Sequence, residues 1–254
     1  MILSPAKALD FSREHHNLEV SRPDFDQDAQ KLVAILKKKS VSDLQQMMSL
    51  SEDLARLNAL RYEAFASDQN KDHRKPAVLV FNGDTYQGLN AGDFDCEDHS
   101  FAQQHLRILS GLYGVLRPLD VIEPYRLEMG TRLKTDRGYS LYDYWGERVA
   151  QALEAADVGE CVLNCASQEY FRVAGPHLKV PVITPQFKEE RDGDLKMISF
   201  FAKRARGAMA RFVIKNRINS VEEIKEFDLD GYRFNLELST ETVPVFTRPH
   251  PNSA

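Results

Sequence analysis

The chain has 254 residues, of which 43% are hydrophobic and 28% are charged. This composition is typical of a globular protein and excludes a disordered or collagen-like chain. No apolar run approaches the roughly 18 residues that a membrane-spanning helix needs, and the first residues lack the pattern of a secretory signal. We therefore expect a cytoplasmic protein with no membrane partner, folded as one compact domain over residues 1–254. The sequence leaves the oligomeric state open, with a monomer favoured. Its three cysteines are expected to be thiols.

The formal net charge is −5, but its distribution is uneven. Residues 195–219 contain no acidic side chain and seven basic ones, namely Lys196, Lys203, Arg204, Arg206, Arg211, Lys215 and Arg217. Such a run is often the solvated face of a helix. Ordinary solvated helices mix both signs to gain i,i+4 pairs, so the lack of acids also favours a surface that binds phosphates. Both interpretations stay open.

The first predicted elements along the chain are helices. Residues 29–38 have a helical pattern, and residues 41–62 have the pattern of two short helices joined by a hairpin, with Ser49 and Glu52 spaced as a capping box. The segment resembles a helix-hairpin-helix motif, in which main-chain N–H groups, here around Ser49, Leu50 and Ser51, contact a DNA phosphate. The usual motif has glycine where this chain has serine, and an ordinary α-hairpin is equally consistent with the segment.

Residues 77–81 form an apolar run that predicts a buried strand, and residues 101–109 have a helical pattern. Between them lies a group that suggests direct iron binding, made of Asp93, Asp95, Cys96, Glu97, Asp98, His99 and His105. The two histidines are six residues apart, which does not bring them to one helix face. Acids before a helix start are also favoured by the helix dipole. We therefore expect no metal site and no cofactor.

Residues 107–132 combine glycines with several arginines, including Arg107, Arg117 and Arg126. Glycine lets a backbone approach an anionic ligand closely, and arginine supplies forked donors to phosphate. The alternative is a buried turn whose arginines pair with Asp120, Glu123 and Glu128. The segment lacks the Gly-Lys-Ser/Thr spacing of a Walker loop.

The second half of the chain alternates helices and strands. The patterns predict a helix at 141–155, strands at 162–163 and 182–183, a hairpin of 182–188 with 195–201, a basic helix at 202–217, and a helix capped by Ser220 and Glu223. Gly207 inside the basic helix indicates close approach of another backbone or of a ligand. The alternation favours an α/β or mixed α+β fold.

Six blocks of sequence, in this order, resemble the YaaA family of bacterial peroxide-stress proteins. They are Ser4-Pro5-Ala6-Lys7, Phe81-Asn82-Gly83-Asp84, the stretch 106–114, the stretch 124–131, the stretch 166–171 and Ala202-Lys203-Arg204-Ala205-Arg206-Gly207. The resemblance runs from residue 2 to about residue 239. It implies an α/β fold with a helix-hairpin-helix element and a basic cleft that binds double-stranded DNA without sequence preference. It also implies protection from hydrogen peroxide, with lower free intracellular iron.

DNA binding is accordingly our first functional hypothesis. The residues that we expect to contact the duplex are Ser49, Leu50, Ser51, Arg107, Arg117, Arg126, Lys203, Arg204, Arg206, Arg211 and Lys215. Arg204, Arg211 and Lys215 share one face of the basic helix, opposite its apolar face.

An enzyme acting on nucleobases or damaged nucleic acid is the alternative. The blocks hold polar residues that an electrostatic binder does not need, namely Ser4, Lys7, Asp84, Ser110, Tyr113, Arg126, Asn164, Ser167, Glu169 and Lys188. Asp84 or Glu169 is a candidate general base, and Lys7 a candidate nucleophile or electrostatic clamp. Each residue also has a structural interpretation, and convergence of at least four of them in one place favours the enzyme.

Overall fold

The computed structural model describes residues 1–12, 18–66, 74–156, 159–191 and 193–251. At its centre β1 (Ile2–Leu3) pairs in parallel with β5 (Arg107–Ser110), which pairs antiparallel with β6 (Gly114–Leu116). A parallel bridge from Ile2 to Asn164 sets β8 (Val162–Leu163) on the other edge of β1, and β9 (Val182–Ile183) pairs in parallel with β8. The order β9-β8-β1-β5-β6 places four parallel strands side by side, β9 to β5, with β1 between β8 and β5.

Two short ladders lie beside this sheet and correct one predicted element. They pair β2 (Ala8–Leu9) with β4 (Phe81–Asn82), and β3 (Lys75–Pro76) with β7 (Val121–Ile122). Between β3 and β4 the predicted strand 77–81 is instead a helical turn, α4 (Ala77–Val80). The prediction of burial is confirmed, because all four residues of α4 are buried. A short apolar run buried on all sides carries no periodicity that separates a strand from a helix.

Two predicted helices have different bounds in the structure. The helix predicted at 101–109 is α6 (Cys96–His105), and its last predicted residues belong to β5. The helix predicted at 141–155 is two, α7 (Leu141–Trp145) and α8 (Arg148–Ala155). Gly146 separates them with a φ of 50°, a left-handed conformation that only glycine adopts at little cost.

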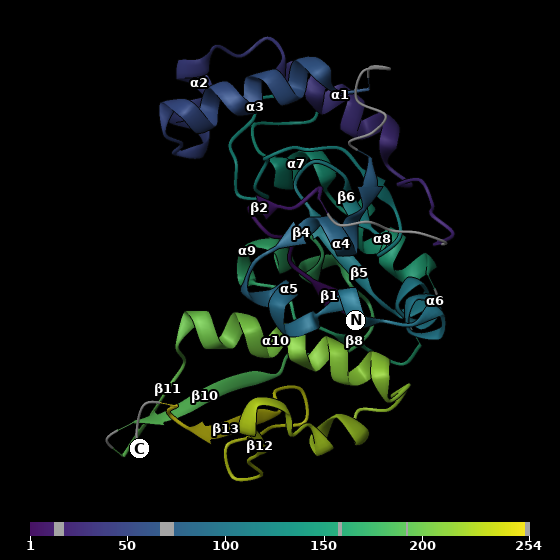
Figure 1. Cartoon of the computed structure of the whole chain (residues 1–254), viewed down its shortest axis with the longest axis vertical. Coiled ribbons are helices and arrows are strands. Elements are labelled where there is room, and N and C mark those ends of the chain that lie inside the picture. Colours follow the sequence, from purple (N-terminus) through teal and green to yellow (C-terminus); the bar gives the residue numbers. More distant parts are fainter. Residues whose placement is uncertain (13–17, 67–73, 157–158, 192, 252–254) are drawn as a thin grey trace.

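Three helices form the upper end of the molecule in Figure 1: α1 (Asp26–Leu36), α2 (Val41–Met48) and α3 (Glu52–Ala64). The predicted pair of helices is confirmed, but the predicted Ser49–Glu52 capping box is wrong. Ser49 ends α2 in a left-handed conformation, and the hydroxyl of Ser51 accepts the N–H of Leu54 at the start of α3. The role of this pair as a DNA-binding motif stays a prediction.

The basic helix is α10 (Ser199–Lys215), which lies between the central body and a second sheet (Figure 1). That sheet has the order β11-β10-β13-β12, built from β10 (Gln186–Arg191), β11 (Asp194–Lys196), β12 (Arg233–Phe234) and β13 (Val245–Pro249). A hairpin forms here by the antiparallel pairing of β10 with β11, but the predicted strand bounds are wrong: residues 189–191 pair with 194–196, residues 182–183 form β9, and residues 199–201 are already helical. Buried aromatic rings fill this sheet's core: Phe187, Phe227, Tyr232 and Phe246.

The remaining helices are short. They are α5 (Asp84–Leu89), α9 (Gln168–Phe171), η2 (Ala91–Asp93), η3 (Gly175–His177), η4 (Glu223–Glu226) and η5 (Leu229–Gly231). Ser220 and Glu223 form the predicted reciprocal contacts, but the element that follows is the 3₁₀ turn η4, whose N-cap residue is Glu222. No helix in the described ranges is both long and apolar enough to span a membrane. The predicted mixed fold of helices and strands is confirmed.

A crossing of two helices explains the glycine inside α10. A Cβ on Gly207 would lie 1.7 Å from the carbonyl oxygen of Thr85, and a Cβ on Gly88 would lie 2.0 Å from that of Arg204. Two glycines therefore allow the backbones of α5 and α10 to touch. The close approach predicted at Gly207 is a packing contact between helices.

Candidate functional site

The carboxyl ends of three parallel strands carry the polar residues that the sequence singled out. Ser4 follows β1, Ser110 ends β5, and the segment from Asn164 to Ser167 follows β8. These strands are neighbours, so their carboxyl ends meet at one edge of the sheet. In open α/β sheets, ligands bind outside this edge, where neighbouring strands connect in opposite directions. The fold thus places the candidate site there.

Ser4 and Ser167 join the ends of β1 and β8. The backbone N–H of Ser167 donates to Ser4 Oγ at 2.8 Å, and the two hydroxyl oxygens are 3.2 Å apart. Tyr86 from α5 donates its hydroxyl to the carbonyl oxygen of Ser4 at 3.1 Å. The carbonyl and hydroxyl oxygens of Ser4 are thus both fixed by residues distant in the sequence.

A second group of contacts lies three residues further along from Ser4. Lys7 Nζ is 2.8 Å from Glu128 Oε2, and Arg126 Nη2 is 3.1 Å from Glu128 Oε1. One carboxylate is therefore held between two cations, with Lys7 64% exposed and Arg126 17% exposed. The Nε of Arg126 is buried and has no hydrogen-bond partner among the described residues. Tyr62 donates to the Arg126 carbonyl oxygen and fixes the backbone there.

Glu169 completes the group from the start of α9. Its Oε1 accepts the N–H of Gly130 at 3.0 Å, and its carbonyl oxygen accepts the hydroxyl of Tyr142 at 2.9 Å. Gly130 is two residues from Glu128, so this bond ties α9 to the same loop. Six residues of these contacts carry the polar side chains at the carboxyl edge, and we call them the carboxyl-edge cluster: Ser4, Lys7, Arg126, Glu128, Ser167 and Glu169.

Three buried tyrosines, Tyr86, Tyr125 and Tyr170, lie near the cluster residues in the core. Burial raises the pKa values of Tyr86 and Tyr170 well above the usual range, and the nearby Tyr125 raises both values further. Burial also raises the pKa of Tyr125, whose hydroxyl lies 2.7 Å from Ser110 Oγ. These phenols are neutral hydrogen-bonding groups at physiological pH. Ser110 contacts Tyr125 and forms no hydrogen bond with the six cluster residues in the described ranges.

The predicted catalytic candidates divide into two groups. Lys7, Arg126 and Glu169 lie in the cluster, and Asp84 begins α5 just after the β4 strand that pairs with Ala8. Lys188 lies apart, on β10 in the second sheet. Sequence reasoning missed Glu128 as a site residue, because its spacing from Arg126 indicated only an ion pair.

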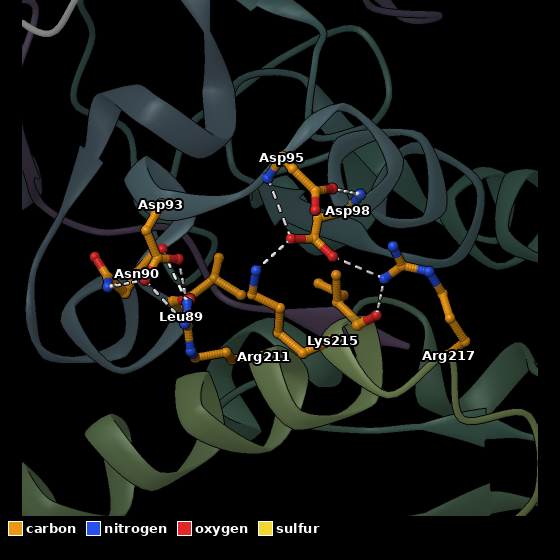
Figure 2. A network of polar contacts seen from close by, with 9 residues as sticks. Leu89, Asn90, Asp93, Asp95, Asp98, Arg211, Lys215 and Arg217 are labelled. Atoms are coloured by element: carbon orange, nitrogen blue, oxygen red, sulfur yellow. Dashed lines mark hydrogen bonds and ion pairs between the residues drawn. The ribbon is translucent and has the colours of Figure 1, made fainter.

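Most basic residues of α10 form ion pairs inside the molecule (Figure 2). Arg211 donates to both carboxylate oxygens of Asp93, at 2.6 and 2.9 Å, and Lys215 and Arg217 contact Asp98 at 2.5 and 2.8 Å. The same helix reaches the second sheet's side through Arg204, which lies 3.2 Å from an Asp230 oxygen. In the described part of the chain, Lys203 and Arg206 form no ion pair.

The arginines of 107–132 are also engaged. Arg107 donates to carbonyl oxygens that end α6, and Arg117 pairs with Asp120 and Asp24. The alternative of a turn whose arginines pair with acids is thus confirmed for Arg117 and Arg126. Tyr113 is buried against Tyr125, which leaves it no face on which a base could stack.

Five of the seven residues of the iron hypothesis have other partners. Asp93 and Asp98 hold α10, Asp95 caps α6, and the rings of His99 and His105 pack on Phe94 and Phe101. Among the described residues, no three of the side chains of His, Cys, Asp and Glu are grouped to hold a metal ion.

Comparison with known proteins identifies the family. The family model described as peroxide stress protein YaaA matches residues 1–238. The chain belongs to this family. It is 51% identical over 254 residues to a UPF0246 protein of Ruegeria pomeroyi, with 98% of each chain covered. It is 52% identical over 259 residues to a UPF0246 protein of Roseobacter denitrificans, covering 100% of this chain and 99% of the relative.

A relative of the same name from Caulobacter vibrioides is 49% identical over 255 residues, with 99% of each chain covered. The carboxyl-edge cluster, α5 and α10 all lie within the residues that the YaaA family model matches. The resemblance seen in the sequence is confirmed, and membership of the family associates the chain with oxidative stress.

Proposed function

We propose that this member of the YaaA family binds duplex DNA without reading its bases, as part of the response to peroxide. The observation that carries the proposal is a pair of cations without ion-pair partners on the half of α10 that crosses α5 at Gly207. Lys203 is exposed and Arg206 half-buried on the first half of α10, and neither forms an ion pair among the described residues. Free basic side chains on one helix can bind the phosphates of a duplex, and such contacts do not read the bases.

The fold brings this half of α10 toward the cluster. Arg206 acts to lower the pKa of the Cys165 thiol, although burial raises that pKa to about 12, and Cys165 precedes Ser167 by two residues. Gly207 touches Thr85 at the start of α5, and β4, which leads into α5, pairs with β2 directly after Lys7. Lys7, Arg126, Lys203 and Arg206 therefore form the proposed phosphate-binding surface.

The turn between α2 and α3 is a weaker candidate for a phosphate contact. Ser49, Leu50 and Ser51 form the predicted hairpin, but Leu50 is buried and the hydroxyl of Ser51 is occupied by Leu54. Glu52 and Asp53 occupy the first turn of α3, where their charge repels phosphate. We therefore assign the main contribution to affinity to the cations near α10.

Fluorescence anisotropy with a labelled duplex of about 20 base pairs tests the proposal. We expect affinity to fall at least tenfold between about 50 and about 200 mM salt, because phosphate contacts release counterions. Lys203→Glu with Arg206→Glu is expected to abolish measurable binding. The matched control is Lys31→Glu with Lys179→Glu, two exposed lysines elsewhere, which changes net charge equally. Equal loss in both variants, or binding that ignores salt, contradicts the proposal.

A second candidate function is an enzyme acting on a nucleobase or on damaged nucleic acid. It is favoured by the convergence of Ser4, Lys7, Arg126, Ser167 and Glu169 at the edge where α/β enzymes bind ligands. Glu128 and Glu169 are two carboxylates able to stabilise a cationic, oxocarbenium-like transition state at a sugar. Lys7 and Arg126 are then the groups that hold the phosphate of a nucleotide.

Base release, detected by mass spectrometry after incubation with nucleosides and with oxidised duplex, tests this candidate. Release that is lost in Glu128→Gln and kept in Glu63→Gln, an exposed glutamate of α3, supports it. The absence of any released base from all substrates contradicts it and leaves DNA binding unaffected.

The lowering of free intracellular iron is also part of the proposal, and it is supported by family membership. Electron paramagnetic resonance of chelated iron in peroxide-treated cells measures it. We expect more chelatable iron in cells lacking the gene than in complemented cells, and equal values contradict this part.

A further inference from the structure

Helix α3 turns its leucines toward solvent. Leu54, Leu57 and Leu60 are 40%, 42% and 68% exposed, whereas the buried face of the helix carries Ala55, Asn58 and Tyr62. Single exposed leucines are common on protein surfaces. Three of them at a spacing of three residues form a continuous apolar stripe, and such stripes mark interaction sites.

Two charged residues flank the stripe without ion-pair partners in the described part of the chain. Asp53 is exposed at the start of α3, and Arg61 is half-buried near its end, donating one hydrogen bond to Asn58. Burial and the nearby Arg126 both act to lower the pKa of Arg61. A carboxylate supplied from outside the chain would therefore stabilise the Arg61 guanidinium.

The order of these residues is self-complementary about Leu57. Leu54 and Leu60 lie three residues to either side of Leu57, and Asp53 and Arg61 lie four residues to either side. In an antiparallel pair of α3 helices with a twofold axis at Leu57, Leu54 of one copy faces Leu60 of the other. The same axis places Asp53 opposite Arg61, twice. An isologous interface requires this self-complementary arrangement.

We propose that α3 is the interface of a homodimer, in which a second copy of this chain covers the leucine stripe. The interface residues lie outside α10 and are not members of the carboxyl-edge cluster, and Arg61 is the one of them that lies near Arg126. One pair of helices of this length buries less than the roughly 1,200 Å² of a stable interface. The dimer is therefore weak and reversible, with a dissociation constant of about micromolar or higher.

Sedimentation of the full chain across a range of concentrations tests the pairing of charges. Asp53→Arg alone and Arg61→Asp alone are each expected to weaken association at least tenfold, because each places like charges opposite one another. The double variant restores the complementary pairs in exchanged positions and is expected to recover association. A double variant as weak as the single ones, or a wild-type chain that is monomeric at about millimolar concentration, overturns the proposal.

Cross-linking tests the position of the axis. In a Cys96→Ser background, which removes the exposed native thiol, Leu57→Cys is expected to form a disulfide-linked dimer on mild oxidation, because residue 57 meets itself at the twofold axis. Arg56→Cys, one residue away on the side of the helix, is the control and is expected to stay monomeric. Equal cross-linking of both variants, or none at Leu57→Cys, contradicts the proposed axis. If Leu57→Gln, which leaves the charge unchanged, weakens DNA binding and the wild-type chain sediments as a monomer, the stripe contacts DNA and the dimer is wrong.

Discussion

Asp98 forms ion pairs with two cations, Lys215 at the end of α10 and Arg217 just beyond it. Its side chain is 3% exposed and accepts hydrogen bonds from Lys215 and Arg217, while its backbone and carboxylate also form the capping box with Asp95. A buried carboxylate needs partners of this kind, because desolvation without them is costly. Two residues with the pattern of surface cations thus join α10 to α6.

The first prediction concerns pH. Burial acts to raise the pKa of Asp98, but the hydrogen bonds from Lys215 and Arg217 outweigh burial and lower the pKa to about 2. The charged carboxylate therefore stabilises the fold at any pH above its unfolded pKa near 4, by roughly 2 kcal/mol. This contribution declines as the pH falls from about 4 toward 2.

Urea denaturation of the wild type and of Asp98→Asn measures this contribution. At neutral pH we expect the variant to be less stable by roughly 2 to 4 kcal/mol, and the difference to shrink as the pH falls below about 4. The control is Asp194→Asn, an exposed partner of Lys196 whose loss costs less than about 1 kcal/mol. A difference that is constant with pH would refute the role of the charge.

The second prediction concerns the thiols. Burial raises the pKa of Cys165 to about 12 and also raises that of Cys161, while Cys96 is exposed. Because the thiolate is the reactive species, iodoacetamide at neutral pH is expected to modify Cys96 first and to leave Cys165 intact until the protein unfolds. Peptide mass spectrometry follows the order of labelling, and early modification of Cys165 would contradict it.

At the scale of elements, the sequence predicts what periodicity and local chemistry determine. The apolar face of α10, its close approach at Gly207 and the hairpin before it are all visible in the pattern of residues. The run 77–81 is not assigned correctly, because complete burial removes the alternation that distinguishes a strand. The end of α6 is misplaced for a related reason, since the apolar residues that continue its pattern pair with β1 as a strand.

The third prediction tests the crossing of α5 and α10. Gly207→Ala places a methyl group against the Thr85 carbonyl, which forces the two backbones apart. Alanine forms helices more readily than glycine, but the clash outweighs this gain. We therefore expect the free energy of unfolding to fall by roughly 2 to 4 kcal/mol. Gly92→Ala is the control, because a Cβ there meets no atom within 4 Å. Unchanged thermal stability of Gly207→Ala would contradict the crossing.

At the scale of the molecule, the candidate site depends on topology that no local pattern contains. Ser4 and Ser167 are 163 residues apart, and they meet because β8 lies beside β1 in the sheet. The blocks of sequence identify most residues of the carboxyl-edge cluster, yet their spacing does not show that they converge. Glu128 lies in one of these blocks, where its spacing indicates only an ion pair with Arg126, and its contact with Lys7 depends on the arrangement of the strands.

The charge of the whole molecule is likewise redistributed by folding. The seven basic residues of 195–219 suggest one continuous cationic face, but ion pairs with Asp93, Asp98 and Asp230 neutralise much of it. Our account therefore divides α10 into a half that binds phosphate, with Lys203 and Arg206, and a half that holds the fold together, with Arg211 and Lys215.

The fourth prediction compares two double variants of α10, each of which neutralises two cations. Anisotropy with a duplex measures binding at a temperature where each variant is folded, and thermal unfolding measures stability separately. We expect Lys203→Gln with Arg206→Gln to lose DNA affinity at least tenfold, to flatten the dependence of log affinity on log salt by roughly 2, and to keep its stability. We expect Arg211→Gln with Lys215→Gln to lose stability and to keep its affinity. The opposite assignment, or equal loss of affinity in both variants, would contradict the division of α10.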